Sequence, residues 1–124
     1  MRTALRFVGV LLLVSACTRS NPETQRALGE TVYAIYCQSC HEAPGTGPRL
    51  TPSVLASRLT AARLYTYNQQ QMPYSAEGIL SDEDYMNVTA WLLYRASLIE
   101  SNKTLTMRNM DNIALIAPKT SPSQ

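Results

Sequence analysis

Two cysteines and a histidine stand together in one short stretch, Cys37-Gln38-Ser39-Cys40-His41, and constrain this chain more than any other feature. Thiols three positions apart with an imidazole beside the second are used in three ways: as a redox dithiol, as part of a zinc site, or to attach haem. A dithiol of the thioredoxin kind needs a strand before the motif, whereas zinc needs two further ligands. The surrounding sequence therefore decides among the three.

The rest of the chain favours haem. Asparagine followed by proline at residues 21–22 predicts the start of a helix before the motif, not a strand. His41 is the single histidine, and Cys17 is the only other cysteine, so a second pair of zinc ligands is missing. We therefore predict that Cys37 and Cys40 form thioethers with one haem c and that His41 is an axial ligand of its iron.

The N-terminal segment is typical of export. After two arginines, residues 7–14 form an apolar run that is too short to span a bilayer. The sequence Val14-Ser15-Ala16-Cys17 resembles a bacterial lipoprotein signal, and ordinary signal cleavage after Ala16 is the alternative at the same bond. We predict a lipoprotein signal peptide over residues 1–16, because acylation gives the third cysteine a function. Cys17 would then carry the two or more acyl chains that stable membrane anchoring requires.

The charge balance excludes one class of partner. The whole chain has a net charge of +2, but removing Arg2 and Arg6 with the signal leaves nine basic and nine acidic residues. The remaining charges are scattered and form no basic stripe, so we expect no binding to nucleic acid. The protein is expected to be lipid-anchored to the membrane, in the periplasm or on the outer face of the cytoplasmic membrane.

The pattern of apolar residues predicts an all-α fold with about three helices and no strands. The first helix is expected from about Glu23 to Tyr36, and Gly29 in its middle indicates that another helix crosses closely there. The second helix should begin at Thr51-Pro52 and end near Tyr67. The side chains expected to face the core are Ala27, Leu28, Val32, Ile35 and Tyr36 in the first helix, and Leu55, Leu59 and Ala62 in the second.

The third helix has the clearest start. Ser81 followed by Asp84 matches a capping box, and the acidic residues 82–84 suit the positive end of a helix dipole. Leu80 and Tyr85 are placed to form a hydrophobic staple around this cap. The apolar stripe that follows comprises Tyr85, Val88, Leu92 and Ile99, flanked by Trp91 and Leu93.

The predicted organisation is one domain. Prolines and glycines interrupt the helical pattern at residues 42–50 and 68–78, which are expected to be loops. The domain covers residues 22–100, and residues 17–21 form a polar tether before it. Residues 101–124 are polar and without periodicity, so they form a C-terminal tail whose conformation the sequence does not predict.

A second axial ligand for the iron must come from a residue other than histidine. Methionine is the obvious candidate, because a thioether opposite histidine is the usual pairing for electron-carrying haem c. Met86 falls in the first turn of the third helix, where methionine usually fills a core, and Met107 and Met110 lie in the tail. Met72 lies on a loop before a stiffening proline, far enough from the motif for a helix to reach the opposite haem face. We predict Met72 as the ligand.

These features together resemble those of bacterial class I monohaem cytochromes c. The segments that carry the resemblance, between about residues 26 and 96, are Gly29-x-x-x-Tyr33, Cys37 to His41, Gly47-Pro48, Met72-Pro73, Leu80 to Asp84 and Val88 to Leu92. The resemblance implies an all-α cytochrome c-like fold around one haem, in which the helix that carries Gly29 crosses the last helix near Val88 and Trp91. One departure is Glu42, where such proteins often have glycine, and it concerns the shape of the first loop.

The resemblance also implies a role for Pro48. Its carbonyl would accept a hydrogen bond from the Nδ1–H of His41, which fixes the imidazole tautomer and makes the ring a better donor to iron. With both axial positions filled, no small-molecule substrate is expected at the iron, and the protein is predicted not to be an enzyme. Its partners would be a redox donor and a redox acceptor.

Two functions remain open at this point. The protein is either a stand-alone single-electron carrier or the haem c subunit of a larger membrane-associated oxidoreductase or oxidase complex. A tail that docks onto a partner would favour the subunit. A third possibility, a haem enzyme or gas sensor, requires that Met72 is absent from the iron or is readily displaced.

Overall fold

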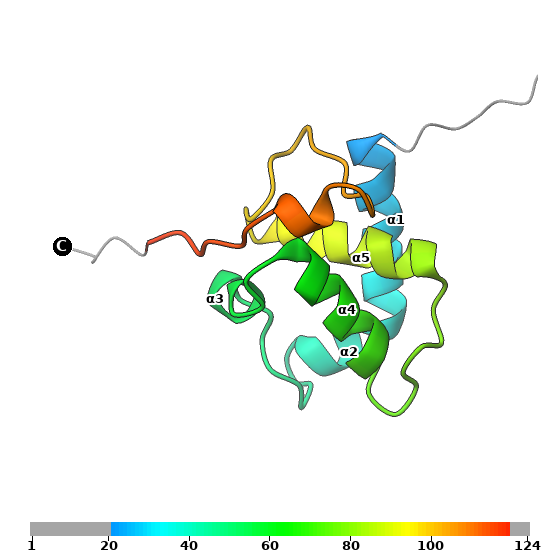
Figure 1. Cartoon of the computed structure of the whole chain (residues 1–124). Helices are drawn as coiled ribbons and strands as arrows, with labels where there is room; N and C mark the ends of the chain where they lie inside the picture. Colours follow the sequence, from blue (N-terminus) through cyan, green and yellow to red (C-terminus); the bar gives the residue numbers. More distant parts are fainter. Residues whose placement is uncertain (1–20, 120–124) are drawn as a thin grey trace, which may run out of the picture.

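The computed structural model describes residues 21–119, and within this range the chain is all-α, as the sequence predicts. The helices are α1 (Pro22–Tyr36), α2 (Gln38–His41), α3 (Pro52–Ala56), α4 (Ala61–Gln71) and α5 (Asp82–Arg95), followed by the short 3₁₀ helix η1 (Met110–Asn112) (Figure 1). Residues 21–119 contain no strand, only an isolated antiparallel bridge between Thr60 and Ala114.

None of the helices in this range is long and apolar enough to cross a membrane. The predicted signal peptide and Cys17 lie outside the described residues.

The centre of the fold is the crossing of α1 and α5 (Figure 1). A Cβ atom at Gly29 would lie 2.1 Å from the carbonyl oxygen of Asn87, so only glycine lets the helices approach this closely. One turn further along α1, the ring of Tyr33 packs at 4.5 Å between centroids on the ring of Trp91. The close helix crossing predicted from Gly29 is confirmed.

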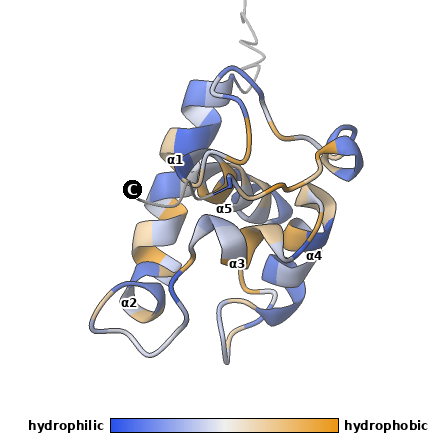
Figure 2. Ribbon diagram, turned by 90° about the vertical axis from the view of Figure 1, so that its left-hand side faces the viewer, coloured by the Kyte–Doolittle hydropathy of each residue, from blue (hydrophilic) through white to orange (hydrophobic). Residues whose placement is uncertain are grey.

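The buried face of α1 differs from the predicted one. The buried residues of this helix are Gln25, Gly29, Val32 and Tyr33. Leu28 and Ile35, which were expected to face the core, have 45% and 64% of their surfaces exposed. Figure 2 shows that α1 carries both hydrophilic and hydrophobic residues along its length. The reason is that Gly29 determines which side of α1 contacts α5. Neighbouring residues are turned by about 100° around a helix, which rotates Leu28 away from α5.

The predicted second helix is two helices. α3 ends at Ala56, and the chain passes through Leu59 in a left-handed conformation with φ of 72° before Thr60 caps α4. Leu59 is 57% exposed and does not join the core face, which corrects the prediction. Distant residues stabilise the break: the Leu59 carbonyl accepts a hydrogen bond from the Leu115 amide (2.8 Å), and the Ala61 amide donates to the Ile113 carbonyl (2.9 Å). α4 then continues to Gln71, past the end predicted near Tyr67.

The third predicted helix, α5, begins as expected. The Ser81 hydroxyl accepts a hydrogen bond from the Asp84 amide at 3.1 Å and donates one to the Asp84 carboxylate at 2.8 Å. The helix ends at Arg95, so Ile99 lies beyond it, partly buried against the core. The capping pattern therefore predicted the start of α5 correctly, whereas the predicted apolar stripe continues to Ile99, beyond the end of the helix.

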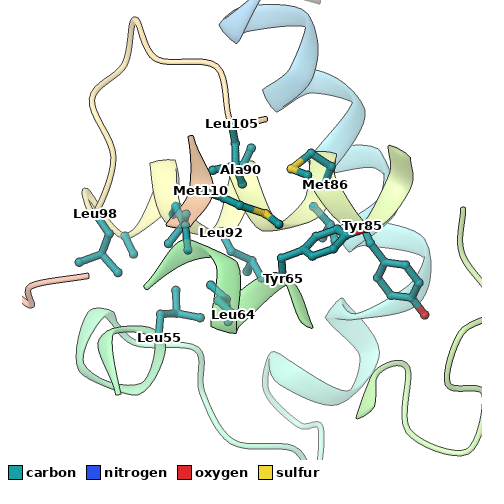
Figure 3. Packing of buried hydrophobic residues seen from close by; sticks show 14 of the residues in the cluster. Leu55, Leu64, Tyr65, Tyr85, Met86, Ala90, Leu92, Leu98, Leu105 and Met110 are labelled. Atoms are coloured by element: carbon teal, nitrogen blue, oxygen red, sulfur yellow. The ribbon is translucent and has the colours of Figure 1, made fainter. Parts of the chain in front are cut away.

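Residues 101–119 pack onto the domain and contribute to its core. The Gln25 side chain, 3% exposed, donates a hydrogen bond to the Leu105 carbonyl and accepts one from the Leu105 amide, both at 2.8 Å. Leu105 and Met110 belong to the same buried cluster as Leu92 of α5 (Figure 3). Leu115 is also buried. Much of the segment for which the sequence predicts no conformation is thus needed to close the core.

Candidate haem site

A cavity of about 450 Å³ opens between α2, the loop after it, α3, α4, the loop after α4, and α5. Its volume is within the range of about 300–1,000 Å³ usual for cofactor sites. Its walls are mainly apolar, and the residues that line it are Tyr36, Cys37, Cys40, His41, Thr46, Gly47, Pro48, Leu50, Val54, Leu55, Arg58, Leu64, Tyr67, Asn68, Met72, Pro73, Tyr74, Leu80, Tyr85, Val88 and Leu92. The predicted haem-site residues Cys37, Cys40, His41, Pro48 and Met72 all line this cavity. The predicted lipid-anchor residue, Cys17, lies outside the described residues.

The attachment motif occupies the junction of two helices. Cys37 caps the end of α1, where its amide donates to the Tyr33 carbonyl at 2.9 Å, and Cys40 and His41 lie in the single turn of α2. The turn is closed by a hydrogen bond of 3.0 Å from the His41 amide to the Cys37 carbonyl. This turn places both thiols and the imidazole, which is 8% exposed, on the cavity.

His41 is oriented by the loop that follows α2. Its Nδ1 lies 2.7 Å from the carbonyl oxygen of Pro48. A carbonyl only accepts hydrogen bonds, so Nδ1 carries the proton and Nε2 is left with a free lone pair, the form that binds a metal ion. Gly45 permits this loop to fold against α2, because a Cβ there would lie 2.4 Å from the Cys40 carbonyl oxygen.

Glu42, the departure from the family pattern, links this loop to both main helices. Its carboxylate accepts a hydrogen bond from the Tyr33 hydroxyl at 2.7 Å and pairs with Arg95 at 2.9 Å and Arg49 at 3.4 Å. These contacts, the Tyr33 hydrogen bond first, hold the pKa of Glu42 below its usual range. Burial and the Glu42 hydrogen bond raise the pKa of Tyr33 to about 12. Glutamate therefore ties the end of the attachment motif to the α1–α5 crossing.

The four methionines in residues 21–119 are placed very differently. Met72 follows the last residue of α4, and it is the one that lines the cavity. Met86 and Met110 are 9% and 7% exposed and belong to the hydrophobic core, whereas Met107 is 60% exposed. The cavity thus brings Met72 together with Cys37, Cys40 and His41, although α4 lies between them in the chain.

Sequence reasoning missed the role of Tyr85. It was expected to pack in a hydrophobic staple, yet its hydroxyl donates to the Met72 carbonyl at 2.7 Å and accepts from the Gly78 amide at 2.9 Å. The signal was present in the residue type, because a tyrosine at a core position needs a hydrogen-bond partner that phenylalanine does not. Arg58, which stacks 3.4 Å from the Tyr67 ring centroid at the cavity wall, had no such signal.

The donor set and the walls fit a haem better than the alternatives. Burial, followed by the nearby Cys40, raises the pKa of the Cys37 thiol to about 11, whereas reactive dithiols have a depressed pKa. The motif follows a helix in an all-α domain, not a strand. Residues 21–119 contain no cluster of three or more histidine, cysteine or acidic side chains that suits zinc. A large apolar cavity with two thiols, one imidazole and one thioether on its walls has the size and the donor groups to hold a haem.

Comparison with known proteins gives two findings. The family model described as "Cytochrome C oxidase, cbb3-type, subunit III" matches residues 24–92, a range that includes the attachment motif and Met72. The solved structure titled "Crystal Structure of the Sulfane Dehydrogenase SoxCD from Paracoccus pantotrophus" is similar with a TM-score of 0.51 and 22% identity, over 99% of this chain and 73% of that one. At this identity the similarity concerns the fold. No curated protein matches the chain.

Proposed function

The chain belongs to the cytochrome c family described as cbb3-type oxidase subunit III, and we propose that it is a single-electron carrier with one covalent, His/Met-ligated haem c. The observation that carries the proposal is the cavity on which Cys37, Cys40, His41 and Met72 meet. When bound there, haem supplies an iron that takes up or releases one electron. The protein's own residues determine how readily it does so.

Three features of the cavity favour electron transfer over catalysis. The Pro48 carbonyl keeps His41 in one tautomer and one orientation, in which its Nε2 would be available to bind the iron. The apolar walls would exclude water from a bound haem, and both these walls and the neutral Met72 thioether would favour the reduced, less charged iron. If His41 and Met72 both bind the iron, they would leave no position on it for a substrate.

The covalent attachment is tested by denaturing the purified protein. We expect the haem to remain with the chain on a denaturing gel and to be present at one per chain in a haemochrome assay. Cys37→Ala with Cys40→Ala should abolish the retained haem. Haem that is lost on denaturation of the wild type would contradict covalent attachment.

We further propose that the protein is tethered by lipid on Cys17, outside the cytoplasm. The support is the signal-like sequence and the otherwise unused cysteine in an exported chain. Cys17→Ser should release the protein from membranes without loss of haem. A variant that stays membrane-bound would rule out the lipoprotein interpretation.

A second candidate function is a haem c subunit of an oxidase or another oxidoreductase. It is favoured by the family description, which names an oxidase subunit. Deleting the C-terminal tail is a poor test, because Leu105, Met110 and Leu115 are in the core. Met107 and Ile116, which are 60% and 80% exposed, are better probes, since charged substitutions there leave the core intact.

The two candidates differ in co-purification. A subunit should be recovered in fixed proportion with a membrane complex, and a carrier should not. If Met107→Glu with Ile116→Glu leaves a stoichiometric association unchanged, docking through the tail is excluded. A haem enzyme or gas sensor would instead show an iron that binds external ligands readily, because Met72 is absent from the iron or is easily displaced from it.

A further inference from the structure

The loop between α4 and α5 begins at Met72, and the backbone of this residue is hydrogen-bonded on both sides. Its amide donates to the Asn68 carbonyl in the last turn of α4 at 3.0 Å. Its carbonyl accepts from the Tyr85 hydroxyl of α5 at 2.7 Å. The peptide groups of Met72 are thereby fixed to two helices while its side chain lines the cavity.

The same Tyr85 hydroxyl closes the loop. It accepts a hydrogen bond of 2.9 Å from the amide of Gly78, whose left-handed conformation has φ of 74°. One oxygen atom therefore joins both ends of residues 72–78. Tyr85 is 2% exposed, and Figure 3 shows its ring at the edge of the hydrophobic cluster, so the hydroxyl is presented from a rigid position.

The position of Tyr85 relative to α4 is also fixed by buried hydrogen bonds. The Thr89 hydroxyl donates to the Tyr85 carbonyl at 2.7 Å and accepts from the Asn68 side-chain amide at 3.0 Å. Asn68 and Thr89 are 8% and 0% exposed. Because Asn68 also accepts the hydrogen bond from the Met72 amide, the two groups that hold Met72 are connected to each other.

We infer that Tyr85 is a positioning residue that keeps Met72 on the haem iron by holding the 72–78 loop closed. The inference rests on the proposed function, in which Met72 is the axial ligand. Phenylalanine at position 85 would fill the core equally well but would leave the Met72 carbonyl and the Gly78 amide without their partner. Two lost hydrogen bonds should raise the population of the open loop about ten- to a hundredfold.

Imidazole binding to the ferric holoprotein measures this population directly. Imidazole must wait for Met72 to leave, so its apparent dissociation constant equals the intrinsic constant divided by the fraction of open protein. Tyr85→Phe should therefore bind imidazole about ten to a hundred times more tightly than the wild type. Met72→Ala, which has nothing to displace, gives the upper limit of affinity.

Tyr65→Phe is the matched control. Tyr65 is 5% exposed in α4 and does not line the cavity, and the hydrogen bonds to the Met72 carbonyl and the Gly78 amide come from Tyr85, not from Tyr65. We expect its imidazole affinity to stay within about twofold of the wild type. If Tyr85→Phe binds imidazole no more tightly than Tyr65→Phe, the inference is overturned, even if the Tyr85 variant unfolds at lower temperature.

Hydrogen exchange provides a second measurement, which reports on the loop itself. Amide hydrogen exchange of Gly78 in the wild-type holoprotein should be protected, and Tyr85→Phe should accelerate it about ten- to a hundredfold. An unprotected Gly78 amide in the wild type would also overturn the inference. If the wild type already binds imidazole as tightly as Met72→Ala, the proposed axial ligand itself is wrong, and the inference fails with it.

Discussion

The two sides of α5 obtain their stability differently. Towards α1 and the C-terminal segment, the space is filled by protein: Gly29 allows the backbones to touch, Tyr33 packs on Trp91, and Leu105 is 1% exposed. Towards α3 and α4, the walls enclose a cavity of about 450 Å³. One half of this core is therefore filled by the protein's own side chains, whereas the other half has room for a cofactor.

The largest effect should follow loss of the attachment cysteines. Without a bound haem, the apolar walls of this cavity would face water, and the packing that a cofactor supplies there would be lost. Cys37→Ala with Cys40→Ala should therefore leave the protein largely unfolded at the cavity. Hydrogen exchange should show loss of protection in α3 and α4 before α1 and α5. Equal loss of protection in all helices would contradict the conclusion that the two sides of α5 are stabilised differently.

The protein-filled side is tested next by Leu105→Ala. Removing a fully buried leucine should lower the free energy of unfolding by about 2–5 kcal/mol, measured in denaturant with the haem attached. Met107→Ala, two residues further and 60% exposed, should change it by less than about 0.5 kcal/mol. A small effect at Leu105 would mean that the segment after residue 100 is not part of the core.

Gly29→Ala tests the helix crossing. The new Cβ would lie 2.1 Å from the Asn87 carbonyl oxygen, so α1 and α5 must separate, at a cost of about 1–3 kcal/mol. The haem spectrum should hardly change, because Gly29 does not line the cavity. Glu30→Ala, on the exposed side of the same helix, should be nearly neutral. A large spectral change with Gly29→Ala would show that the two sides are coupled.

The smallest effect is expected at Glu42, which connects the two sides. Because its pKa is lowered by Tyr33 and Arg95, the carboxylate stabilises the fold above its ordinary pKa of about 4.3, and this contribution is lost as pH falls through the lower folded value. Glu42→Gln should therefore be less stable than the wild type at neutral pH, and the difference should narrow below about pH 4. Denaturant unfolding at several pH values measures it, with the exposed Glu100→Gln as the control. A difference that widens in acid would contradict this sign.

What the sequence predicted correctly depends on short-range chemistry. Ser81 and Asp84 form a cap within one turn, and Gly29 signals a close helix crossing at its own position. The break at Leu59 was missed because the residues that stabilise it, Ile113 and Leu115, are more than fifty positions away in the chain.

The predictions for the candidate site likewise succeeded where the chemistry is local and failed where distant residues meet. The attachment motif was found because its three side chains lie within one turn, whereas the hydroxyl of Tyr85 meets Met72 only after α4 and α5 have packed. The outward rotation of Leu28 and Ile35 also follows from the tertiary contact at Gly29, which hydrophobicity alone does not report. The periodicity of apolar residues predicted helix α1 but not which of its faces is buried.

Ligation of one haem iron by His41 and Met72 is best tested by the optical spectrum of the ferric protein. The wild type should be low-spin with the weak near-infrared band of methionine–iron ligation. Met72→Ala should lose that band, and Met107→Ala, which changes an exposed methionine away from the cavity, should keep it. A high-spin ferric wild type, or a band that survives Met72→Ala, would contradict the assignment.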